Sequence, residues 1–130
     1  VLEPVIAYLM IAQAQYEDKS LAGNYNVGPD DSDCWTTGNL VDLFCREWNK
    51  QTGTEIKWIN QYDGGPHEAN FLKLDCSKIK STFDWKPRWN VETTMKKIVE
   101  WSKCYLEGND VVVCMEKQIK EFLEKNENGK

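Results

Sequence analysis

One histidine and its neighbours are the residues of this sequence best suited to bind a polar ligand. His67 is the sole histidine, and it lies with Glu68 and Asn70 in a short run that follows the break Gly64-Gly65-Pro66. An imidazole, a carboxylate and a carboxamide can donate or accept hydrogen bonds. A metal site that needs two histidines is excluded. We therefore expect this run to form hydrogen bonds to a ligand and to hold no metal.

The cysteines do not change this expectation. There are five, an odd number, and none forms a CxxC pair, so neither a disulfide framework nor a zinc ribbon is indicated. We expect reduced thiols, several of them buried in helices; the five are Cys34, Cys45, Cys76, Cys104 and Cys114.

Asn26 is a further candidate for ligand binding. It lies near the end of the predicted strand 23–28, which the turn sequence Gly28-Pro29-Asp30-Asp31 closes. Its carboxamide could meet a ligand, or it could satisfy the backbone of the turn, and the sequence leaves both roles open. We expect the acidic run 28–33 to be mostly a solvated loop.

Helices must position these residues. The stretch 5–16 is apolar almost all round, which is typical of a helix buried on more than one side. Thr36 or Thr37 is expected to cap a helix through Thr52, with Gly53 just beyond its end. Short strands are predicted at 55–59 and 72–74.

The second half of the chain is predicted to be helical. Asp75 is expected to cap a helix over 77–83, and Asn90 a longer one that Gly108 ends. Trp85, Pro87 and Trp89 should pack a turn against the core, with Arg88 in a surface pair. A last helix, from about 112 to 125, places its apolar residues on one side. These are Val112, Met115, Ile119, Phe122 and Leu123.

Composition sets limits on size and partners. With 130 residues, of which 41% are hydrophobic, we expect one domain over 1–125 and a flexible tail at 126–130. The fold class is α/β, mostly helical with a few short strands. A net charge of −5 argues against binding nucleic acid. No run of about 18 apolar residues exists, so we expect no membrane span and a cytoplasmic protein.

The middle of the chain resembles a known family. PHEANFLKLDCSK precedes FDWKPRW, and together they resemble the carboxyl-terminal part of extended short-chain dehydrogenases that act on nucleotide sugars. Within that family the likeness is greatest to the 4,6-dehydratases that take CDP-glucose. The flanks VLEPV and GNYNVGPDD also resemble this branch, so the likeness covers nearly the whole chain.

The resemblance implies a two-part enzyme of deoxysugar biosynthesis, such as that of the lipopolysaccharide O-antigen. Its amino-terminal Rossmann domain would hold NAD. Such enzymes use a Tyr-x-x-x-Lys pair, yet none of the five tyrosines has lysine four positions on, and no GxGxxG turn exists. We therefore expect a substrate-binding fragment that binds no NAD, holds no catalytic residue and is inactive alone. Val1, which lacks a helix-capping residue before it, fits that interpretation.

The resemblance also implies roles for the candidate site residues. Asn26 would meet the nucleotide part of CDP-glucose, and His67 would donate to a phosphate. Glu68 would accept from a sugar or ribose hydroxyl, while for Glu68 and Asn70 a structural role is equally open. Gly65 stands where dTDP-glucose relatives have an arginine, so phosphate-binding roles do not transfer simply.

Two alternatives remain open. One is the same region of another nucleotide-sugar epimerase, decarboxylase or dehydratase. The other is a non-catalytic helical module whose last two helices bind another protein or a second copy. For a full-length enzyme we also expect a possible homo-oligomer.

Overall fold

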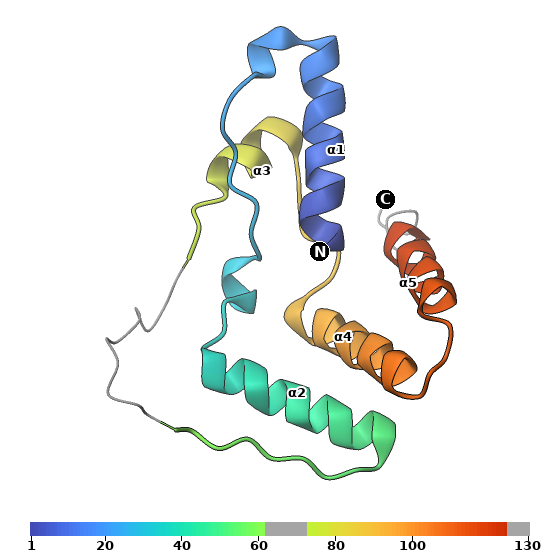
Figure 1. The fold of residues 1–130 in the computed structure, drawn as a ribbon. Helices are drawn as coiled ribbons and strands as arrows, with labels where there is room; N and C mark the ends of the chain where they lie inside the picture. The colour runs from blue at the N-terminus through green and yellow to red at the C-terminus, as the bar shows by residue number, and fades with distance from the viewer. Residues whose placement is uncertain (62–72, 125–130) are drawn as a thin grey trace.

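The structure is a computed structural model, and it describes residues 1–61 and 73–124 (Figure 1). The described residues form five α-helices and two short 3-10 helices. The α-helices are α1 (Leu2–Glu17), α2 (Thr37–Thr52), α3 (Ser77–Phe83), α4 (Val91–Leu106) and α5 (Val111–Glu124). The 3-10 helices are η1 (Lys19–Leu21) and η2 (Asp31–Asp33). The prediction of a mostly helical chain is therefore confirmed.

Local capping explains where the central helices begin and end. Thr36 Oγ1 accepts a hydrogen bond from the amide of Asn39 at 3.3 Å, which satisfies a first-turn donor of α2. The helix ends at Gly53, whose φ of 71° is left-handed and suits glycine. Asn90 Oδ1 caps α4 in the same way, at 2.9 Å from the amide of Thr93. The start and end of α2 and the start of α4 are therefore those predicted from the sequence.

The first core lies between α1, α3 and the segment before η2. Ala7, Cys76, Ile79 and Trp85 form one buried cluster, and Tyr25 packs against it with others. The Tyr25 ring meets that of Phe83 edge to face, with centroids 5.0 Å apart. As expected, Trp85 anchors the turn after α3 in this core.

A second packing layer joins α2, α4 and α5. Leu43 on α2 and Val99 on α4 are almost fully buried. Gln51 ties α2 to α4, because its amide donates to the carbonyl of Lys96 at 3.2 Å and its carbonyl accepts from Lys103 at 3.1 Å. Figure 1 shows α4 running between α2 and α5.

The three predicted strands are not present in the described residues. Segments 23–28 and 54–61 have no regular secondary structure, nor do Lys73 and Leu74. A strand needs a neighbouring strand to take its backbone hydrogen bonds. Here side chains bind the backbone instead: Asn49 both donates to the carbonyl of Ile56 at 3.4 Å and accepts from its amide at 2.7 Å.

The acidic run was wrongly expected to be mostly a solvated loop. Its second half, Asp31–Asp33, forms η2, and two of its carboxylates make ion pairs with lysines in and before α3. Asp30 pairs with Lys80 at 2.5 Å and Asp31 with Lys73 at 2.6 Å. These pairs fasten the run to the start of α3.

Two helices expose apolar residues that the sequence placed in a core. On α5, only Phe122 of the predicted face is buried; Val112, Met115, Ile119 and Leu123 are 40–58% exposed. On α1, which was expected to be buried on more than one side, only Ala7 is buried. Within the described residues these helices are therefore covered on one side only. No described helix is long and apolar enough to cross a membrane.

Glu3 joins the first helix to the turn before α4. Its Oε1 accepts from the amides of Arg88 and Trp89, at 2.8 and 2.7 Å. The Arg88 guanidinium donates to the carbonyl of Phe122 at 3.3 Å and lies over the Phe122 ring. Arg88 therefore links the turn to α5, and its expected surface pair stays a prediction. Because of this chain of contacts, α1, the turn and α5 meet at one point.

Replacing Glu3 should therefore weaken the whole fold. Glu3→Ala leaves two backbone amides without their acceptor, so we expect the free energy of unfolding to fall by about 2–3 kcal/mol. Glu3→Gln keeps an acceptor oxygen and should lose about half as much. Urea denaturation followed by circular dichroism measures both. Equal losses for the two variants would contradict the role of the acceptor.

A charge network fastens α5 to α4. Glu100 accepts from Lys97 and Lys117, both at 2.8 Å, and Lys97 also pairs with Glu121. Burial tends to raise the pKa of Glu100, but hydrogen bonds from Lys117 and Lys97 outweigh it and lower the pKa from 4.5 to about 2. The folded protein thus favours the ionised carboxylate.

This pKa gives a pH-dependent prediction. Because the pKa of Glu100 is lower in the folded chain than in the unfolded chain, the ionised carboxylate stabilises the fold above about pH 4.5. This contribution is lost as the pH falls toward 2. Glu100→Gln should cost about 1–2 kcal/mol at pH 7, and the difference from the unmodified chain should shrink below pH 4. Urea titrations at several pH values test this. The control is Glu116→Gln, at an exposed position of α5, and an equal loss there would refute the assignment.

Candidate functional site

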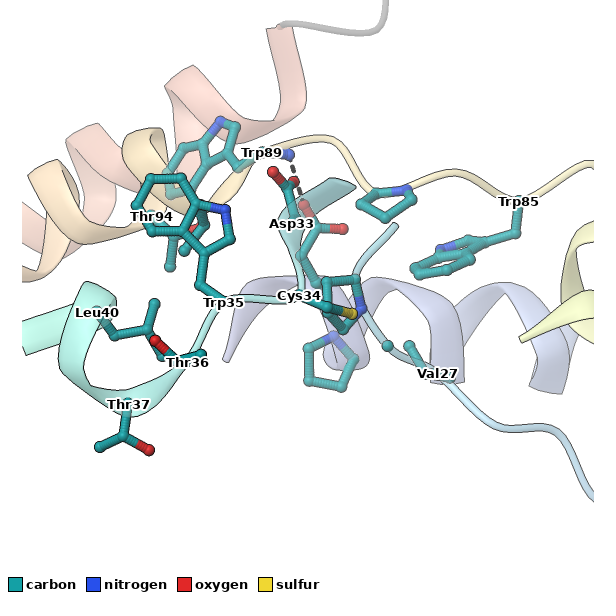
Figure 2. A pocket seen from close by; sticks show the side chains of 16 residues that line it. Val27, Asp33, Cys34, Trp35, Thr36, Thr37, Leu40, Trp85, Trp89 and Thr94 are labelled. Atoms are coloured by element: carbon teal, nitrogen blue, oxygen red, sulfur yellow. Dashed lines mark hydrogen bonds between the residues drawn. The ribbon is translucent and has the colours of Figure 1, made fainter. Parts of the chain in front are cut away.

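A cavity among the described residues lies between the acidic run and the turn before α4. Its volume is about 580 Å³, within the range of small-molecule sites. Trp35, Trp85 and Trp89 line it, and we call it the tryptophan cavity. Figure 2 shows Trp35 and Trp89 on one side of the Asp33 carboxylate and Trp85 on the other.

The aromatic walls are held by contacts outside the cavity. Trp89 packs edge to face on Phe122, with ring centroids 5.0 Å apart and planes at 88°. Trp35 donates its indole N–H to the carbonyl of Ser32 at 3.3 Å. Trp85 is 6% exposed in the first core. The cavity therefore offers indole surfaces whose positions are fixed by their neighbours.

Two carboxylates lie among these rings. Asp33 is half-buried, and burial raises its pKa, with further contributions from Glu92 and Asp30. The amide of Val91 acts in the opposite direction. Glu3 lines the same cavity, and its Oε2 is buried without a hydrogen bond among the described residues. Buried carboxylate oxygens of this kind are stabilised by a donor or a cation.

A second, smaller pocket lies beside Asn26. Its volume is about 500 Å³, and Lys73 and Lys80 line it together with Asp31 and Asp75. We call it the lysine pocket. Asn26 is exposed, and its amide donates to the carbonyl of Asp75 at 3.1 Å. In the described residues Asn26 therefore links its own segment to the residues before α3, rather than to the backbone of its own turn, and its role toward a ligand stays a prediction.

The other predicted site residues cannot be placed. His67, Glu68 and Asn70 lie outside the described residues. The described chain resumes at Lys73, which lines the lysine pocket. Asn26 reaches the lining of this pocket only through its hydrogen bond to Asp75. Asp75 accepts from the amide of Ser77 at 2.9 Å, but the N-cap of α3 is Cys76, so Asp75 lies one residue before the cap position predicted for it.

Sequence reasoning missed the tryptophan cavity. Asp33 was assigned to a solvated loop, and Glu3 was not predicted to take part in a site. The available signals were an acidic residue in the first turn of an apolar helix and the Trp-x-Pro-x-Trp turn. Neither indicates that residues 85 positions apart in the chain meet.

Metal chemistry has no support in the described residues. Over 1–61 and 73–124, no three histidine, cysteine or acidic side chains are grouped so as to hold a metal ion. The thiols of Cys104 and Cys114 lie near each other on α4 and α5, and burial raises the pKa of Cys114. No cysteine of the chain forms a disulfide.

Comparison with known proteins agrees with the motifs. No protein-family profile matches the chain. A CDP-glucose 4,6-dehydratase of Salmonella typhimurium is 36% identical over 124 residues, which is 95% of this chain. The chain spans only 33% of the length of that relative. The resemblance predicted from PHEANFLKLDCSK and FDWKPRW is confirmed, and the chain is similar to the carboxyl-terminal part of a CDP-glucose 4,6-dehydratase.

Proposed function

We propose that this chain is the substrate-binding, carboxyl-terminal part of a nucleotide-sugar dehydratase that acts on CDP-glucose in the cytoplasm. The observation that carries the proposal is the 36% identity over 95% of the chain. An amino-terminal Rossmann domain would precede residue 1 and hold NAD. Residues 1–125 would form the substrate domain, ending in a flexible tail.

The lysine pocket is the part of the structure best suited to a nucleotide diphosphate. Lys73 and Lys80 supply positive charge, and both are now paired with aspartates. A diphosphate could replace those aspartates, because ammonium groups bind phosphate oxygens at least as well. Asn26 and His67 would add hydrogen bonds at its edge. The tryptophan cavity suits this ligand poorly, since two carboxylates line it.

The proposed reaction divides between the two parts of the enzyme. NAD, held by the amino-terminal part, would supply the reversible hydride transfer that the loss of water from the glucose needs. The residues of this chain would bind and orient the sugar nucleotide. Such remote binding raises the rate because it holds the sugar in a reactive position.

Extending the chain tests the proposal. With the residues encoded upstream of Val1 restored, the protein should convert CDP-glucose into a product lighter by one water, detected by mass spectrometry. The chain of 130 residues with added NAD should form none. An upstream sequence without a Gly-rich turn and a Tyr-x-x-x-Lys pair would overturn the proposal. Preference for dTDP-glucose would favour a different nucleotide-sugar enzyme.

The same extended enzyme tests the site residues. His67→Gln should raise KM for CDP-glucose about tenfold with kcat little changed, as expected for loss of one hydrogen bond to a charged group. Lys57→Gln is the control, because Lys57 is exposed and pairs only with Glu55 among the described residues. Equal kinetics for the His67 variant and the control would remove His67 from the site.

An interface on α5 is a second candidate function, favoured by its exposed apolar stripe. Val112, Met115, Ile119 and Leu123 recur at helical spacing on one face. Glu116 and Lys120 carry opposite charges on the same helix, so an antiparallel second copy would be complementary in charge. A homodimer through α5 satisfies both features.

Sedimentation measures this interface directly. The unmodified chain should form dimers at micromolar concentrations, and Ile119→Glu should make it monomeric, because a charge in an apolar interface lacks a partner. Lys120→Glu removes charge complementarity and should weaken the dimer less. If the unmodified chain stays monomeric at micromolar concentrations, the proposed interface is wrong.

A further inference from the structure

The tryptophan cavity has features that the proposed dehydratase function does not use. It presents indole surfaces from two separate segments, the one around Trp35 and the turn that carries Trp85 and Trp89. A cavity of about 580 Å³ exceeds what one side chain fills, and it opens to solvent. Aromatic walls of this kind bind flat or cationic groups.

The charge of the cavity determines which of these groups fits. Its carboxylates, Asp33 and Glu3, are accompanied by no lysine, arginine or histidine among the described residues that line it. Asp30 and Asp31 pair with lysines, but Asp33 makes no ion pair within 1–61 and 73–124. Glu92 and Asp30 add further negative charge near Asp33. A phosphate or carboxylate ligand would be repelled here, whereas a cation would be attracted.

The shape of the lining favours a planar cation. A guanidinium stacks on indole faces and donates several hydrogen bonds in one plane, while an ammonium is a compact, strongly hydrated charge. The Asp33 carboxylate lies between Trp35 and Trp85 in Figure 2, so a stacked guanidinium could reach it. The buried Oε2 of Glu3 adds negative charge beside the cavity.

We infer that the tryptophan cavity binds the side chain of an arginine from a polypeptide. Trp35 and Trp89 stack on the guanidinium, and Asp33 accepts its hydrogen bonds. Free arginine fits less well, because its α-carboxylate would lie near Asp33 and Glu3. The inference does not depend on the dehydratase proposal, since it rests on the cavity alone.

The test uses a neutral isostere of arginine. N-acetyl-arginine methylamide and N-acetyl-citrulline methylamide differ in charge but hardly in shape, and calorimetry measures their binding to the chain. The arginine compound should bind with Kd on the order of 1 mM, as expected for a single side chain, and the citrulline compound at least tenfold more weakly. Free L-arginine should bind more weakly than the capped form.

Matched variants connect binding to the cavity. Asp33→Asn should weaken binding of the arginine compound at least tenfold, whereas Glu116→Gln, at an exposed position of α5 outside the cavity, should leave it unchanged. Trp35→Phe keeps an aromatic face and should reduce affinity less than Trp35→Leu. Circular dichroism confirms that each variant is folded. The inference is overturned by absent binding, by equal binding of the two compounds, by tighter binding of free arginine, or by unchanged affinity in the Asp33 variant.

Discussion

The carboxylate of Glu3 is the contact on which the arrangement of this chain depends. Its Oε1 accepts from the amides of Arg88 and Trp89, so the first turn of α1 is fixed against a turn 85 residues later. Arg88 continues the link to α5 through the carbonyl of Phe122. The same turn before α4 carries Trp89, which lines the tryptophan cavity and packs on Phe122. One side chain therefore sets the position of three helices and one wall of a cavity.

Sequence patterns predicted the elements whose causes are local. Thr36, Asn90 and Gly53 act through neighbouring backbone groups, so the ends of α2 and the start of α4 follow from residue types alone. The strands were not predictable in this way. Segment 55–59 has the alternation of a strand, but that alternation indicates only which side could be buried. A strand forms only where another strand supplies hydrogen bonds.

The candidate site was predictable only in part, because its members come from distant segments. Asn26 was recognised by its place before a turn, yet its partner, the carbonyl of Asp75, is 49 residues away. Asp33 belongs to a run of acidic residues whose members look equivalent in sequence. Folding separates them: Asp30 and Asp31 reach lysines, while Asp33 faces indole rings. No local pattern distinguishes one carboxylate of such a run from the next.

The division of charge along that run has a functional consequence. Asp31 lines the lysine pocket, and Asp30 pairs with Lys80, which also lines it. Asp33, two residues after Asp31, lines the tryptophan cavity. The two pockets favour ligands of opposite charge. Lysines attract an anion to the lysine pocket, whereas carboxylates that form no ion pair among the described residues attract a cation to the tryptophan cavity. A diphosphate that displaced Asp30 or Asp31 from its lysine would release negative charge next to Asp33 and so strengthen the attraction of the cavity for a cation. Through η2, occupation of the lysine pocket would thus favour occupation of the tryptophan cavity, and by thermodynamic reciprocity a bound arginine side chain would favour the anion.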